Sequence, residues 1–196
     1  MGNAHTDHAG HDHHGAPASF WARWVTTTNH KDIGTLYLVF AGVMFIIGGL
    51  MAMVIRAELF KPGLQFVDPA FFNSMTTVHA LAMIFGGMMP AWTGLANWMI
   101  PMQVGAPDMA LPRLNNFSFW LLAFAWLLLV ATLFMPGGAP AGGWTLYPPL
   151  VLQGGDSLPM AIFAVHLMGA SSIMGAINVI VTIMNMRAPG MTLLRM

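Results

Sequence analysis

In Ser74-Met-Thr-Thr-Val-His-Ala-Leu-Ala-Met-Ile-Phe-Gly-Gly-Met-Met-Pro90, one histidine, His79, stands among apolar residues. The stretch continues to Ile100 without an Asp, Glu, Lys or Arg, so as a helix it is long enough to cross a hydrocarbon core of about 30 Å. An ionisable side chain inside such a span is costly and therefore indicates a functional site. A neutral imidazole in apolar surroundings is also a common ligand of haem iron.

The composition of the whole chain is that of an integral membrane protein. Of 196 residues, 57% are apolar and only 7% are charged, whereas globular domains carry roughly a quarter charged residues. The net charge is zero, which does not favour nucleic acid as a partner. There is no cysteine, which excludes disulfides and thiolate metal ligands.

Four uncharged stretches predict an all-α protein with four transmembrane helices, because a lipid-exposed backbone must satisfy its own hydrogen bonds. They cover residues 33–55, 74–100, 117–135 and 158–186. Pro90 predicts a kink within the second. Lys and Arg are more numerous beside one set of ends, which predicts that both termini are cytoplasmic. The residues of that set are Arg23, Lys31, Arg113, Arg187 and Arg195, against Arg56 and Lys61 at the other ends.

A second histidine, His166, lies in the fourth predicted helix at about the same depth as His79. Two histidines at matching depth on different helices can ligate one haem. The residues alone therefore leave open a self-contained four-helix carrier of electrons with a b-type haem. A chain that binds no haem is a third interpretation.

Six further strings extend the pattern around His79 over nearly all of residues 26–188. They are Thr28-Asn-His-Lys-Asp-Ile-Gly-Thr-Leu-Tyr37, Ile55-Arg-Ala-Glu-Leu59, Asn97-Trp-Met-Ile-Pro101, Gly105-Ala-Pro-Asp-Met-Ala-Leu-Pro-Arg-Leu-Asn-Asn116, Gly143-Trp-Thr-Leu-Tyr-Pro-Pro149 and His166-Leu-Met-Gly-Ala-Ser-Ser-Ile-Met-Gly-Ala-Ile-Asn178. Together they resemble subunit I of the haem-copper cytochrome c oxidases. The first and fourth strings look like the branch that uses cytochrome c rather than quinol.

The resemblance implies a larger bundle of about twelve membrane helices, packed by the usual rules of helix association in lipid. This sequence is therefore interpreted as the N-terminal portion, whether a fragment, a truncated gene product or a piece of a split protein. Residues 1–30 are predicted to be a His-rich cytoplasmic tail, 31–188 the four-helix region, and 189–196 the start of the next segment. By itself such a portion is not expected to reduce oxygen.

The implied activity is that of a proton-pumping oxidase in the bacterial inner membrane, passing electrons from cytochrome c to O₂ to give water. The implied partners are the membrane, the remainder of subunit I, oxidase subunits II and III, and cytochrome c. Haem a would be held through His79, while haem a₃ and the copper ion CuB are expected in the full-length subunit only.

The resemblance also assigns residues near the haem. His79 matches an axial ligand of low-spin haem a, and Arg56 matches a cation at the haem formyl group. Trp144 and Tyr147 are placed near the haem edge. Glu58 and Gly63 match a site for Ca²⁺ or Na⁺, and carboxylate and carbonyl oxygens suit such ions. Without the resemblance, Arg56 is a snorkelling side chain and Glu58 a turn carboxylate.

A proton-uptake path is implied at the cytoplasmic side, with Asp108 at its entrance. Its other members would be Asn97, Asn115, Asn116, Ser118, Ser171, Ser172 and Tyr37. Without the resemblance, Asp108 is a turn former and the others are interhelical hydrogen bonds. His166 is assigned a structural hydrogen bond. Five histidines between His5 and His14 form a run that is typical of loose Zn²⁺, Ni²⁺ or Cu²⁺ binding in a disordered tail.

Overall fold

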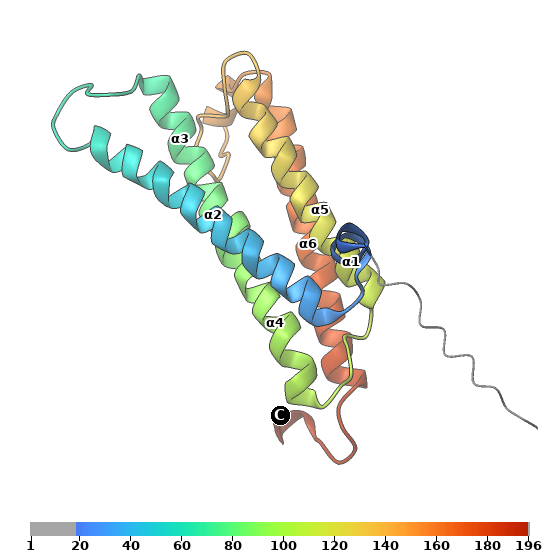
Figure 1. The fold of residues 1–196 in the computed structure, drawn as a ribbon. Coiled ribbons are helices and arrows are strands. Elements are labelled where there is room, and N and C mark those ends of the chain that lie inside the picture. The colour runs from blue at the N-terminus through green and yellow to red at the C-terminus, as the bar shows by residue number, and fades with distance from the viewer. Residues whose placement is uncertain (1–18, 196) are drawn as a thin grey trace, which may run out of the picture.

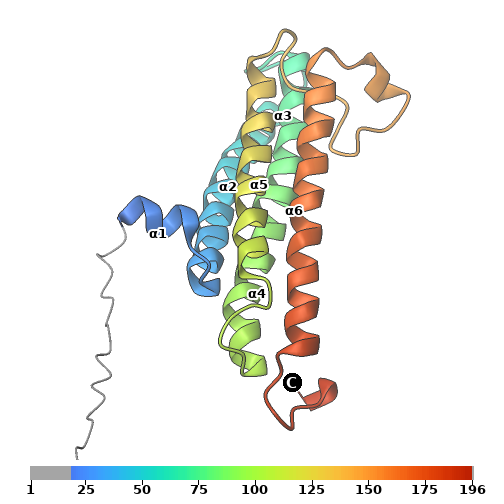
Figure 2. The same cartoon turned by 90° about the vertical axis from the view of Figure 1, so that its right-hand side faces the viewer.

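Four long helical segments lie side by side in the computed structural model, which describes residues 19–195 (Figures 1 and 2). The first is α2 (His30–Glu58), and the second is continuous through α3 (Pro69–Leu81), η1 (Ala82–Met88) and α4 (Met89–Val104). The third and fourth are α5 (Pro112–Ala131) and α6 (Ser157–Asn185). The described residues contain no strand, and the His-rich run between His5 and His14 lies outside them.

All four segments are long and apolar enough to span a membrane, which confirms the predicted all-α membrane fold. Each begins earlier than the uncharged stretch that predicted it, and a polar residue caps the start of the first two. The Asn29 side chain accepts hydrogen bonds from the first N–H groups of α2, and Asp68 does the same for α3. A prediction from hydropathy omits the polar residues of the first helical turn, such as Lys31 and Asp32 in α2.

Short elements complete the chain. Helix α1 (Phe20–Thr26) lies within the predicted tail, where the Ser19 hydroxyl caps it by accepting from the Ala22 N–H at 3.2 Å. Helix α1 is not predicted from the sequence, because two turns are too short for a clear helical period. Three 3₁₀ turns follow: η2 (Thr132–Phe134), η3 (Leu150–Gln153) and η4 (Leu193–Arg195).

The second segment contains a π-helical stretch, η1, where Pro90 predicts a kink. Pro90 has no N–H to donate to the preceding turn, so the regular helix cannot pass through it without losing a bond. The wider π turn lies directly before it and carries Gly86 and Gly87, both buried. Such stretches often occur at functional sites.

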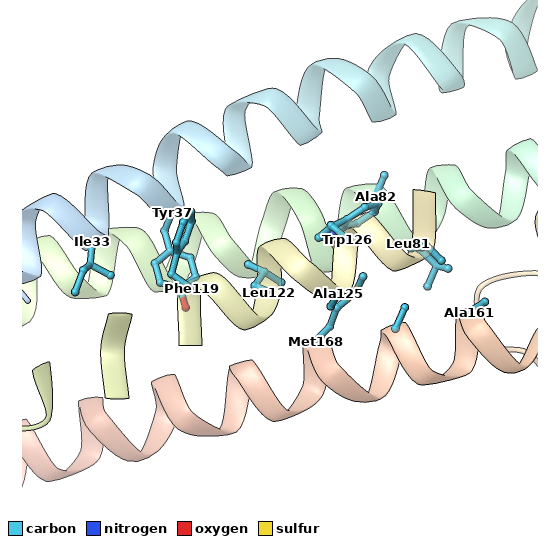
Figure 3. Close-up of a cluster of buried hydrophobic side chains, with 12 residues drawn as sticks. Ile33, Tyr37, Leu81, Ala82, Phe119, Leu122, Ala125, Trp126, Ala161 and Met168 are labelled. Atoms are coloured by element: carbon cyan, nitrogen blue, oxygen red, sulfur yellow. The ribbon is translucent and has the colours of Figure 1, made fainter. Parts of the chain in front are cut away.

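The core of the bundle is formed by one side of each long segment (Figure 3). Tyr37 of α2 meets Phe119 of α5 edge to face, with ring centroids 5.1 Å apart, and α6 contributes Ala161, Ala164 and Met168. Most of α2 is not covered: only seven of its 29 residues are buried. Its exposed apolar side chains are suited to lipid or to further helices.

Helices α2 and α4 approach closely at two glycines. A Cβ atom on Gly94 would lie 2.8 Å from Leu38 Cγ and 2.9 Å from the Gly34 carbonyl oxygen. Because the second contact is with backbone, Gly94→Ala must push the helices apart. We expect it to lower the free energy of unfolding by about 1–3 kcal/mol, measured by denaturant titration in detergent. Gly42→Ala on the open side of α2 is the control, and an equal effect there would contradict the packing argument.

The two ends of the bundle are called the Asp108 end and the Glu58 end, each after a residue that lies there. At the Asp108 end, α2 and α5 begin, and α4 and α6 finish. At the Glu58 end, α2 is joined to α3 and α5 is joined to α6 through longer loops (Figure 1).

Candidate functional site

His79 is held by a hydrogen bond that fixes its ring. Its Nδ1 lies 2.8 Å from the carbonyl oxygen of Gly48 on α2. A carbonyl only accepts, so Nδ1 carries the proton and Nε2 keeps its lone pair. This arrangement is typical of metal-bound histidines, in which the distal nitrogen donates to a backbone carbonyl. The half-buried His79 ring therefore fits an axial haem ligand.

The loop between α5 and α6 is fastened to the helix that carries His79. The Ser74 hydroxyl donates to the carbonyl of Ala139 at 2.6 Å, and the N–H of Gly143 donates to the Thr77 hydroxyl at 2.9 Å. Trp144, next to Gly143, is thereby kept at the Glu58 end near the same helix. Its side chain is half exposed.

Arg56 and Tyr147 are not joined to His79 by any hydrogen bond in the described part of the chain. Arg56 lies on the last turns of α2, about 12 Å along the helix axis from Gly48 at about 1.5 Å per residue. Its side chain is exposed, and so is the Tyr147 ring. The structure therefore leaves the predicted haem contacts of both residues untested.

His166 and His79 are not brought together. The His166 ring is exposed on α6, and its Nδ1 lies 2.8 Å from the carbonyl of Ile162 on the same helix. His79 instead bonds to α2. This geometry does not favour one haem held between the two histidines.

A row of buried polar groups starts near the Asp108 end. His30 Nδ1 lies 2.7 Å from the Asn97 carbonyl, joining α2 to α4. The Asn115 side-chain amide donates to the Asn97 side-chain oxygen, joining α5 to α4. Asn97 and Asn115 are each only 1% exposed, so both amides are removed from lipid and solvent.

The row continues toward the middle of the bundle. The Ser118 hydroxyl donates to the Asn115 carbonyl at 2.7 Å and lies 2.8 Å from the Tyr37 hydroxyl. Ser171 on α6 donates to the Ser118 carbonyl at 2.6 Å. Beside Tyr37 and Ser171 is a cavity of about 20 Å³ that Ser172 and Thr93 also line. That volume holds about one water molecule.

Asp108 lies in the loop before α5, where its carboxylate accepts from the Met109 N–H at 2.7 Å. The following residues are fastened to α6. The N–H of Ala110 donates to the Thr182 hydroxyl at 2.9 Å, and the N–H of Leu111 donates to the Asn178 side-chain oxygen at 2.8 Å. The loop that presents Asp108 is therefore fixed close to the buried row.

Asn178 and Thr182 are residues that the sequence analysis did not assign. A signal was present, because Asn178 follows Ser171 by seven residues and Thr182 follows by four more, which places the three on one side of α6. All three are buried. The buried Asn178 Nδ2 and Asn115 Oδ1 find no hydrogen-bond partner among the described residues. One is a donor and the other an acceptor, which suits ordered water.

Asn116 does not join this row. Its side-chain amide donates to the Val25 carbonyl at 3.2 Å, beside α1. Adjacent residues of a helix are separated by about 100°, so Asn115 faces the interior of the bundle while Asn116 does not. The predicted place of Asn116 in the path is therefore not supported by its geometry.

Glu58 closes the loop that follows α2. One carboxylate oxygen accepts from the N–H of Gln65 at 2.8 Å, and the other accepts from Phe66 at 2.7 Å and Val67 at 3.1 Å. Three of about four lone-pair positions are thus used. The Gly63 carbonyl lies 3.5 Å from the Gln65 side-chain nitrogen. The described residues hold no group of three acidic or histidine side chains that could bind a metal. A Ca²⁺ or Na⁺ ion held by Glu58 and backbone carbonyls, as Gly63 would offer, therefore stays a prediction.

Glu58→Ala is expected to loosen this loop, because three backbone N–H groups lose their acceptor. Chymotrypsin should then cleave faster at Phe60 and Phe66, whose side chains are already exposed. Lys61→Ala in the same loop is the control, since the Lys61 side chain is exposed. Equal cleavage of the wild-type and Glu58→Ala chains would contradict the role of the carboxylate.

Comparison with known proteins gives a consistent result. The family described as "Cytochrome C and Quinol oxidase polypeptide I" matches residues 32–196. A relative from Streptomyces avermitilis, "Probable cytochrome c oxidase subunit 1-alpha", is 45% identical over 183 residues, which is 92% of this chain and 32% of that protein. "Cytochrome c oxidase subunit 1" of Cereibacter sphaeroides is 42% identical over 220 residues, 95% of this chain and 39% of that protein. The chain thus spans about a third of the length of these relatives.

Proposed function

The chain belongs to the cytochrome c and quinol oxidase polypeptide I family, and on that premise we propose that it is the N-terminal portion of the catalytic subunit of a proton-pumping cytochrome c oxidase. The assembled enzyme would take electrons from cytochrome c and reduce O₂ to water. Its partners would be the remainder of subunit I, subunits II and III, and cytochrome c. The names of the relatives support this choice of electron donor.

Haem and copper are cofactors of the family in general, and the finer proposal is that His79 holds low-spin haem a. The hydrogen bond from Nδ1 to the Gly48 carbonyl supports it, because it keeps Nε2 unprotonated and the ring in a fixed orientation. A haem there would supply one-electron transfer. Arg56, an exposed cation on the same helix as Gly48, would favour the reduced haem electrostatically.

The chain's own share in the reaction would be proton uptake from the Asp108 end. The observation that carries this proposal is the buried polar row that begins at Asn97 and Asn115, near the Asp108 end, and reaches the cavity beside Tyr37 and Ser171. A carboxylate at the mouth collects protons, and amide and hydroxyl groups bind water in a file without burying a charge. Structural hydrogen bonds alone do not require a cavity at the end of the row.

The direction of uptake follows from charge. Lys31, Arg113 and Arg187 lie at the Asp108 end, whereas Arg56 and Lys61 lie at the Glu58 end. Because cytoplasmic loops carry more Lys and Arg, we propose that the Asp108 end faces the cytoplasm of a bacterium and the Glu58 end the periplasm.

The test is Asp108→Asn in the assembled oxidase. Oxygen consumption with reduced cytochrome c should fall about tenfold, because a nearby group or water must replace the carboxylate as proton collector. Asp156→Asn is the control, since Asp156 is an exposed carboxylate at the opposite end. Unchanged turnover in Asp108→Asn, with haem content intact, would remove the residue from the path.

A further inference from the structure

Helix α1 has an apolar side that the rest of the described chain does not cover. Phe20 is 68% exposed, Trp21 75% and Val25 43%. At about 100° per residue these three and Trp24 share one side of the helix, while Arg23 and Thr26 lie on the other. A short helix with aromatic residues on one side and polar residues on the other is amphipathic.

Specific contacts hold α1 in its place. The Val25 carbonyl accepts from the Trp120 indole N–H at 3.0 Å as well as from Asn116. Arg23 forms a salt bridge with Asp32 in the first turn of α2, with Nη2 and Oδ1 3.1 Å apart. Figure 2 shows α1 projecting sideways from the bundle, beside the start of α2. The exposed aromatic side is therefore held in one orientation.

Along the chain, α1 lies just before the point where the uncharged, membrane-spanning part of α2 begins. Three residues separate α1 from α2, and the uncharged part of α2 begins at Ile33, directly after Lys31 and Asp32. Further along the span, α2 exposes apolar side chains, for example at Val39 and Ile46. An exposed apolar side on a helix that lies where the uncharged span begins is matched by lipid at the membrane surface.

We propose that α1 is an interfacial helix that inserts Phe20 and Trp21 among the lipid headgroups and upper acyl chains at the Asp108 end. Tryptophan is favoured at this depth, and amphipathic helices lie in the plane of the interface. Lys31, exposed at the start of α2, suits anionic headgroups. Through the bonds from Asn116 and Trp120 on α5 and the salt bridge to Asp32 on α2, α1 then sets the depth of the start of both helices. This inference rests on membership of a membrane family and not on the proton path.

Spin labels can measure the depth of α1 directly, because this chain contains no cysteine of its own. Trp21→Cys and Thr26→Cys would each be labelled in the assembled oxidase, with cysteines of other subunits blocked, in vesicles of phosphatidylcholine and phosphatidylglycerol. We expect the ratio of collisions with oxygen to collisions with a water-soluble nickel complex to be at least threefold higher at position 21. Equal ratios would place α1 in water, and protection from both agents at position 21 would place it against protein; either result overturns the proposal.

A second measurement removes the aromatic side chains. Trypsin cleavage after Arg23 should be at least tenfold faster in the double variant Phe20→Ser, Trp21→Ser, in vesicles that expose the Asp108 end. Phe60→Ser is the matched control, since Phe60 is an equally exposed aromatic residue at the other end. An unchanged haem spectrum would show that the bundle is intact in both variants. Cleavage of the double variant at the wild-type rate would overturn the proposal.

Discussion

His79→Ala abolishes the low-spin haem absorption of the assembled oxidase, if His79 is the axial ligand. The iron would lose the imidazole that the Gly48 carbonyl orients, and alanine offers no donor atom. Loss of an outer hydrogen-bond partner alone typically weakens a metal site about 10–100-fold, so loss of the ligand itself should have a larger effect. The reduced-minus-oxidised spectrum and the haem content of the purified enzyme measure it. Electron input from cytochrome c should stop as well.

A matched variant and a rescue separate ligation from misfolding. His166→Ala should retain the low-spin signal, because that ring is exposed and bonds only to its own helix. Added imidazole should partly restore the signal in His79→Ala, since a small ligand can occupy the half-buried space that the side chain leaves. Loss of the signal in His166→Ala would instead favour the carrier that uses both histidines.

The membrane fold is largely predictable from the sequence, because the lipid requirement for satisfied backbone groups leaves long uncharged stretches only one regular structure. Structural features that depend on one or two hydrogen bonds cannot be predicted from the sequence in the same way. Helix α1 depends on the Ser19 cap and on the Val25 carbonyl bonds from α5, and neither has a periodic signal. The π turn depends on how the helix adjusts before Pro90, for which a kink is only the general expectation.

Individual residues of the candidate site could be predicted from the sequence, but their positions relative to one another and their hydrogen-bond partners could not. Hydropathy and resemblance pointed to His79 and Asp108, yet the partner of His79 is a backbone carbonyl that no side-chain pattern encodes. Asn115 and Asn116 look alike in sequence, and only the helix rotation separates the buried amide from the one beside α1. Asn178 was not assigned, because an amide side chain in an apolar helix commonly makes only a hydrogen bond to a neighbouring helix.

Asn115→Leu is expected to interrupt the polar row at its link between α5 and α4. Leucine has a similar size but no polar atom, so the bond to Asn97 is lost and the Asn97 side-chain oxygen is left without that donor. A file of waters cannot pass a leucine side chain at a position that is 1% exposed. Oxygen turnover should fall about a hundredfold, the lower range for loss of a proton-transfer group. Reduction of the low-spin haem by cytochrome c should stay fast, because electron entry does not use the row.

Asn116→Leu makes this prediction specific, because the same substitution one residue later removes only an amide that binds the Val25 carbonyl. Its turnover should remain within about twofold of wild type, which corresponds to less than about 0.5 kcal/mol in the barrier. Equal losses in the two variants would mean that α5 as a whole, and not the row, limits turnover. A large loss in Asn116→Leu with none in Asn115→Leu would place the proton path on the α1 side of the bundle, where the described residues form no buried polar row.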